Sequence, residues 1–89
     1  MALADPPAWW NWDLRITQHA ESRMEQRGLA EIELREMLER AASLAPDVVE
    51  ARFVALCSHP GRPWEVILEP DEHEQVVNVI TVYPLGRRQ

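Results

Sequence analysis

The sequence of 89 residues predicts a two-layer α+β domain in which two helices pack on an antiparallel meander sheet. The first half of the chain, up to Pro46, has apolar residues at helical spacing. The second half consists of extended apolar runs joined by short turns. The hydrophobic fraction of 46% is that of a single globular domain. We expect an N-terminal arm over residues 1–13, the domain over 14–85 and a tail over 86–89, with the element order (β)-α-α-β-β-β.

Two helices are predicted in the first half of the chain. The first spans Gln18–Arg27, because Thr17 is a favourable N-cap and Gly28 can take the left-handed conformation that ends a helix. Leu14–Ile16, just before it, is a candidate short strand. The second helix is predicted over Glu31–Leu44, on an apolar stripe made by Leu34, Met37, Leu38, Ala41, Leu44 and Ala45.

Three strands are predicted in the second half, over Val48–Cys57, Trp64–Glu69 and Val76–Tyr83. Turns rich in proline, glycine and acidic residues connect them. Because links this short favour antiparallel neighbours, the strands should form a meander with the helices on one face. The expected core contains Met24, Leu34, Leu38, Val54, Val66 and Ile80.

The first helix carries a histidine and two arginines at four-residue spacing. Arg23 lies about 40° and Arg27 about 80° from His19 on a helical wheel, so the three share one stripe. Arg27 falls on the apolar side of the wheel, where a guanidinium must be paired, and we predict that Arg27 and Gly28 are structural. His19 and Arg23 are equally consistent with a structural role and with a phosphate site.

The N-terminal arm contains three of the four tryptophans, Trp9, Trp10 and Trp12. One interpretation is that these rings pack over the domain's own sheet. The other is that they bind a partner or a second copy, because tryptophan is enriched at interface hot spots. We predict contact with another chain.

Composition excludes several classes of function. The net charge of −6 argues against non-specific nucleic-acid binding, although all nine basic residues are arginines. The chain has neither a phosphate loop nor a dinucleotide fingerprint, and its three histidines and single cysteine lack metal-ligand spacing, so we expect no cofactor and no metal. The absence of a long apolar run and of a signal peptide predicts a cytoplasmic protein without a membrane span, and Cys57 should be a core residue.

The residues that remain are compatible with metal-independent cleavage of a phosphodiester. His19 could move a proton, Arg23 could hold the phosphate, and Tyr83 or Glu65 could be the second proton-transfer group. The competing interpretations are that Tyr83 is a rim residue of the last strand and that Glu65 faces solvent.

Two separated motifs also carry a family resemblance. The run His19-Ala20-x-x-Arg23-Met24-x-x-Arg27-Gly28 and the closing Val79-Ile80-Thr81-Val82-Tyr83 resemble the bacterial family called domain of unknown function 4258, over roughly residues 14–84. That family is similar to the RelE/ParE and BrnT toxins of toxin–antitoxin modules. The resemblance implies a RelE-like fold whose free sheet face meets RNA or the ribosome and is blocked by an antitoxin. The chain departs from these basic nucleases by its acidity, and its RNA contacts would be chiefly Arg52 and Arg62, with Arg87 and Arg88 on the tail.

Two functions follow as hypotheses. The first is a toxin that acts as a metal-independent endoribonuclease on mRNA or at the ribosome, with a cognate antitoxin or a second copy as its protein partner. The alternative is a non-catalytic protein-interaction module on the same fold.

Overall fold

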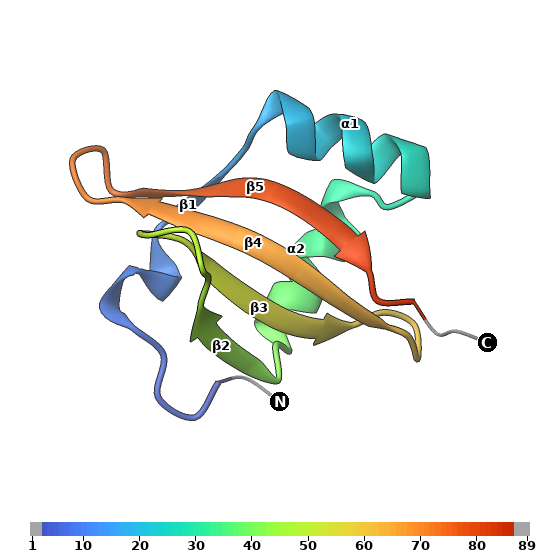
Figure 1. The fold of residues 1–89 in the computed structure, drawn as a ribbon, viewed down its shortest axis with the longest axis horizontal. Coiled ribbons are helices and arrows are strands. Elements are labelled where there is room, and N and C mark those ends of the chain that lie inside the picture. The colour runs from blue at the N-terminus through green and yellow to red at the C-terminus, as the bar shows by residue number, and fades with distance from the viewer. Residues whose placement is uncertain (1–2, 87–89) are drawn as a thin grey trace.

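The computed structural model describes residues 3–86, so that Arg87 and Arg88 of the predicted tail lie outside the described residues. Figure 1 shows a mixed sheet with α2 behind it and α1 beside β5. The elements are a 3₁₀-helix at Ala8–Asn11, β1 at Asp13–Ile16, α1 at Gln18–Arg27, α2 at Glu31–Glu39, β2 at Ser43–Pro46, β3 at Phe53–Ser58, β4 at Pro63–Asp71 and β5 at Val76–Pro84.

The five-stranded sheet has the order β1-β5-β4-β3-β2. Strands β2 to β5 are antiparallel neighbours, which confirms the predicted meander and extends it by β2. Strand β1 confirms the candidate strand before the first helix, but it pairs in parallel with β5, so the sheet is mixed. The α+β class with two helices on one sheet is confirmed.

Helix α1 is formed as predicted and is anchored to β5 at its start. The Thr17 hydroxyl accepts a 3.1 Å hydrogen bond from the Ala20 N–H and donates a 2.8 Å hydrogen bond to the Val79 carbonyl. At the other end Gly28 takes a φ of 70°, the left-handed conformation expected of the residue that ends the helix. One threonine therefore both caps the helix and fixes it against the sheet.

The prediction that the second helix reaches Leu44 is wrong. Helix α2 ends at Glu39, and Ser43–Pro46 forms β2, whose Leu44 lies opposite Ala55 of β3. Pro46 favours this outcome, because a proline disfavours helical backbone at the residue before it. The backbone N–H and C=O groups of Ser43–Pro46, which the apolar pattern placed in a helix, form their hydrogen bonds with β3 instead.

The start of the first predicted strand, Val48–Cys57, also moves. Residues 48–52 form a turn rather than the start of a strand, and β3 begins at Phe53. Val48 is 99% exposed at this turn, and Ala51 has a φ of 72°, which only a turn accommodates. The valines of this segment resemble a strand in sequence but contribute nothing to the core.

The core lies between the sheet and the two helices. Met24, Leu34, Leu38 and Val66 are buried there as predicted, whereas Val54 and Ile80 are only partly buried. Successive strand residues alternate between faces, so Ala55 and Cys57 take the inner positions of β3 and Val54 does not. Ile80 is the extra residue of a β-bulge, because Ile67 pairs with Thr81 and Leu68 with Val79. The complete buried apolar cluster consists of Ala20, Met24, Leu29, Leu34, Met37, Leu38, Ala41, Ala55, Cys57, Trp64, Val66, Leu68, Val77, Val79 and Val82.

Candidate functional site

The histidine and arginines of α1 lie on its solvent-accessible side. His19 and Arg27 are exposed and Arg23 is half-buried. Arg23 donates a 3.3 Å hydrogen bond from Nη1 to Gln26, one turn along the same helix. Among residues 3–86, no carboxylate forms an ion pair with any of these three side chains.

The expected burial of Arg27 is therefore wrong. Only Ala20 and Met24 of α1 are buried, which makes the apolar contact narrower than the wheel suggested. Arg27 lies at the edge of that contact, where a long side chain can extend its guanidinium into water. Because the guanidinium of Arg27 stays hydrated, it needs no carboxylate partner, and its positive charge remains accessible on the helix surface.

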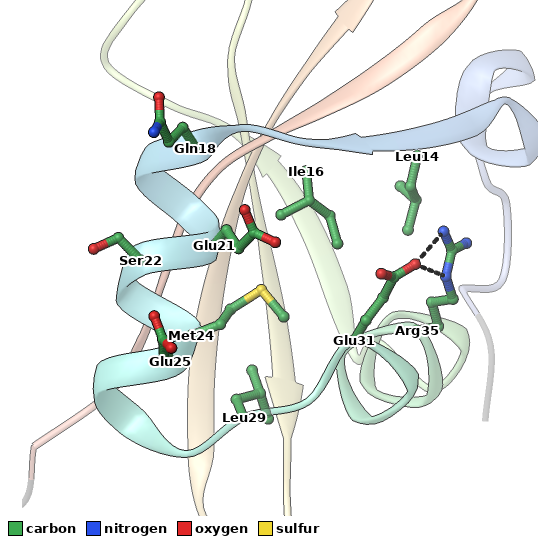
Figure 2. A pocket seen from close by; sticks show the side chains of 10 residues that line it. All are labelled: Leu14, Ile16, Gln18, Glu21, Ser22, Met24, Glu25, Leu29, Glu31 and Arg35. Carbon is green, nitrogen blue, oxygen red and sulfur yellow. Dashed lines mark hydrogen bonds and ion pairs between the residues drawn. The ribbon is translucent and has the colours of Figure 1, made fainter.

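The acids of α1 occupy the opposite side of the helix. Glu21 and Glu25 border an open cleft of about 770 Å³ between α1, β1 and the start of α2. Figure 2 shows Leu14, Ile16 and Met24 directed into this cleft, with the Glu31–Arg35 pair on the α2 side. Helix α1 thus separates its charges, with cations on one side and carboxylates on the other.

Tyr83 and Glu65 form a cross-strand pair on the sheet. Glu65 of β4 lies directly opposite Tyr83 of β5, and the phenol donates a 2.6 Å hydrogen bond to the Glu65 carboxylate. This hydrogen bond, together with partial burial and the negative charges of Glu65 and Asp47, raises the pKa of Tyr83 to about 12. The phenol therefore remains protonated at neutral pH and can donate a hydrogen bond but not serve as a general base.

The predicted catalytic residues come from two different layers. His19 and Arg23 are on α1, which packs against β5, whereas Tyr83 is tied to Glu65 within the sheet. Among the described residues, no hydrogen bond joins Tyr83 to His19 or Arg23. The partnership between Tyr83 and Glu65 has no signal in the sequence alone, because it depends on the register of two strands.

The two predicted RNA-binding arginines are not brought together. Arg52 lies just before β3, and its Nε donates a 2.9 Å hydrogen bond to Glu69 of β4. Arg62 is exposed in the turn that follows the other end of β3. The charge of Arg52 is thus largely neutralised, and a continuous basic strip across the sheet is not formed by these two residues.

The tryptophans of the arm pack on their own domain. Trp9, Trp10 and Trp12 are all partly buried against the core cluster, and the Trp9 ring lies 5.0 Å from that of Phe53. They form part of the lining of a smaller open pocket of about 260 Å³. Packing on the protein's own domain, the first of the two interpretations, therefore buries part of each ring. Contact with another chain stays a prediction.

A polar link between α2 and the β3–β4 turn was not anticipated. His59 Nε2 lies 3.3 Å from Glu33 Oε2, while the other carboxylate oxygen of Glu33 accepts a 2.8 Å hydrogen bond from the Ala30 N–H. The backbone hydrogen bond is the main reason why the pKa of Glu33 is lowered, and His59 adds to it. Glu33 supplies the helix-capping group that Ala30 lacks, so we assign this link to stability.

Cys57 is buried, as predicted, with 2% of its surface exposed. Burial raises the pKa of its thiol to about 12, so the sulfur is not a nucleophile at neutral pH. Residues 3–86 contain no group of three or more histidine, cysteine, aspartate or glutamate side chains positioned to hold a metal ion. In the same part of the chain, no helix combines the length and apolar character needed to cross a membrane.

The fold and these surfaces define a small two-layer α+β domain whose helix α1 carries basic side chains on one side and carboxylates on the other. The sequence model of the family described as domain of unknown function (DUF4258) matches residues 16–84 of the chain. The protein therefore belongs to this family. No curated protein and no solved structure matches the chain.

Proposed function

We propose that this protein is a bacterial toxin of a toxin–antitoxin module, similar to RelE/ParE and BrnT toxins, and that it cleaves mRNA, free or on the ribosome, without a metal ion. The observation that carries the proposal is the unpaired cationic side of α1 in a protein of net charge −6. Guanidinium groups without carboxylate partners attract phosphate oxygens, which accept their hydrogen bonds in pairs. A cytoplasmic location forms part of this proposal, since the substrate is found there.

The proposed reaction is attack of a ribose 2′-hydroxyl on the adjacent phosphorus. A bond forms from the 2′-oxygen to phosphorus, the bond to the 5′-oxygen breaks, and a cyclic phosphate remains. His19 would accept the proton of the 2′-hydroxyl and return it to the departing 5′-oxygen, and Arg23 would stabilise the charge on the non-bridging oxygens. With its pKa near 12 and its single phenolic proton donated to Glu65, Tyr83 would not act as the base, and it would donate a hydrogen bond to the phosphate only by releasing Glu65.

Induced expression in a bacterial host, with growth and RNA integrity followed together, tests the proposal. The wild-type protein should arrest growth and fragment RNA, whereas His19→Ala should lower the cleavage rate by roughly 10²–10⁴-fold. Arg23→Ala should also relieve toxicity. Arg40→Ala is the matched control, because Arg40 is an exposed arginine at the C-cap of the other helix and should leave toxicity unchanged. Full toxicity of well-folded His19→Ala and Arg23→Ala proteins would contradict the assignment.

The second candidate function is a non-catalytic protein-interaction module. The cleft of Figure 2, with its apolar floor, favours this alternative, and a cognate antitoxin or a second copy would be the partner. Intact RNA and normal growth during expression of the wild-type protein would select this function over the first.

A further inference from the structure

The cleft and the tryptophan pocket are adjacent hollows, and we call the two together the groove. Leu14 and Arg35 border both hollows, so the cleft beside α1 and the pocket at the N-terminal arm lie next to each other. The cleft has a volume of about 770 Å³ and the pocket about 260 Å³. A binding site for a small molecule typically measures roughly 300–1,000 Å³, so the groove has room for more than one side chain.

Apolar side chains lie along the floor of the groove, and polar side chains surround them. Leu14, Ile16, Met24 and Leu29 form the floor of the cleft, and Figure 2 shows the first three directed into it. The pocket continues this surface with Trp9, Trp10, Trp12, Leu38, Leu68 and Val77. Leu14 and Ile16 are partly accessible on this floor, whereas Met24 and Leu29 are buried, so a ligand would meet a narrow apolar strip between polar side chains.

The rim of the groove carries an excess of negative charge. Among residues 3–86, Arg35 is the one cation that lines it, and its Nη2 lies 2.9 Å from Glu31, so these two charges cancel. Glu21 and Glu25 at the cleft and Glu39 at the pocket have no ion-pair partner among residues 3–86. Three unpaired carboxylates around an apolar floor complement a ligand that is both apolar and positively charged.

We propose that this groove binds an amphipathic helix of a partner protein that carries lysines or arginines beside its apolar face. The apolar face lies on the floor of the cleft, and one large apolar side chain enters the tryptophan-lined pocket as an anchor. The basic residues lie against Glu21, Glu25 and Glu39. The proposal deepens the interaction-module function by naming the surface and the chemistry of its partner, and it does not depend on RNA cleavage.

The cationic side of α1 is not part of this groove. His19, Arg23 and Arg27 are absent from its lining, whereas Glu21 and Glu25 of the same helix belong to it. A partner helix in the groove would therefore leave the cationic side free. Loss of toxicity in His19→Ala and Arg23→Ala and loss of peptide binding at the groove are consequently separate measurements.

Fluorescence anisotropy with labelled synthetic peptides tests the proposal on the full chain. The probe is an amphipathic peptide of lysine and leucine with one phenylalanine, about fourteen residues or four helical turns long. One control peptide replaces the lysines by glutamates, and another replaces the leucines by serines at unchanged charge. The groove should bind the first peptide in preference to both controls, since the controls lack either charge complementarity or an apolar face.

Charge reversals identify the surface that the peptide occupies. Glu21→Arg with Glu25→Arg should weaken binding by roughly tenfold or more, as reversal of two rim charges implies. Glu36→Arg with Glu72→Arg changes the net charge equally at exposed positions outside the groove, and should weaken binding by less than about threefold. Backbone amide shifts should change at Leu14, Ile16 and Leu29 when the peptide is added.

Three outcomes would overturn the proposal. The first is equal weakening by the two charge-reversed pairs, which would indicate non-specific attraction to an acidic protein. The second is amide shift changes at Val54 and Thr81 instead of the groove, which would place the peptide on the sheet. The third is a dimer in sedimentation velocity that Glu21→Arg with Glu25→Arg dissociates, because the occupant would then be a second copy.

Discussion

Tyr83 and Glu65 face each other across strands β4 and β5 and share a 2.6 Å hydrogen bond in which the phenol is the donor. The carboxylate can accept this hydrogen bond only while the phenol keeps its proton. Loss of the proton would place two negative charges in contact, next to the further charge of Asp47. The pair therefore holds Tyr83 in its neutral form and defines what it can contribute to any chemistry on the sheet.

Because Tyr83 is the single tyrosine of the chain, its ionisation can be followed directly by absorbance near 295 nm. We expect a midpoint near pH 12 in the folded wild-type protein, against 10.0 for an ordinary tyrosine. Glu65→Gln should shift the midpoint toward the ordinary value, because the carboxylate is the main cause of the raised pKa. An unchanged midpoint in Glu65→Gln would contradict this assignment.

The same pKa shift has a consequence for folding. The native state holds the Tyr83 proton more tightly than the unfolded chain does, so its contribution to the free energy of unfolding is complete below pH 10. That contribution should be lost as the pH rises from 10 to about 12. Urea titrations across this range should show a smaller decline in Tyr83→Phe than in the wild type, and an equal decline would contradict the prediction.

Cys57 should be protected from thiol reagents in the folded protein. Its side chain is buried and its pKa is raised to about 12, so both access and thiolate formation are suppressed. We expect reaction with Ellman's reagent at pH 8 to be more than about a hundredfold slower than in urea-unfolded protein, because it requires opening of the core. A native rate close to the unfolded rate would show that the thiol is accessible.

Replacement of Arg27 should barely affect stability. The side chain is exposed, so Arg27→Ala should change the free energy of unfolding by less than about 0.5 kcal/mol. Met24→Ala on the same helix removes a buried side chain and should cost roughly 2–5 kcal/mol. Urea denaturation of the two variants makes the comparison, and a loss of several kcal/mol in Arg27→Ala would restore the structural role inferred from the sequence.

Thr17 should matter more than an ordinary cap. Thr17→Ala removes both the hydrogen bond that its hydroxyl accepts from Ala20 and the one it donates to Val79. We expect a loss of roughly 1–2 kcal/mol. Thr17→Ser keeps the hydroxyl and should recover most of that loss in urea denaturation. If serine is no better than alanine, packing of the methyl group rather than hydrogen bonding explains the effect.

The sequence determined those elements whose signals are local. Thr17 and Gly28 fixed the bounds of α1 because cap preferences depend only on backbone conformation at those positions. The apolar run Val76–Tyr83 likewise predicted β5, which extends one residue further, to Pro84. The predicted burial of Cys57 followed from its place within an apolar run and was confirmed.

Tertiary structure decided what local signals left ambiguous. Leu44 and Ala45 extend the apolar stripe of the second helix in the sequence, but pairing with β3 made Ser43–Pro46 a strand. The pairing of Tyr83 with Glu65 depends on register, which follows from strands meeting and not from either strand alone. The groove required β1, α1 and α2 to converge, and its carboxylates Glu21, Glu25 and Glu39 come from two different helices. The pattern of apolar residues in the sequence indicates which side chains prefer burial. Which other side chains bury them depends on how segments that are distant in the chain pack together.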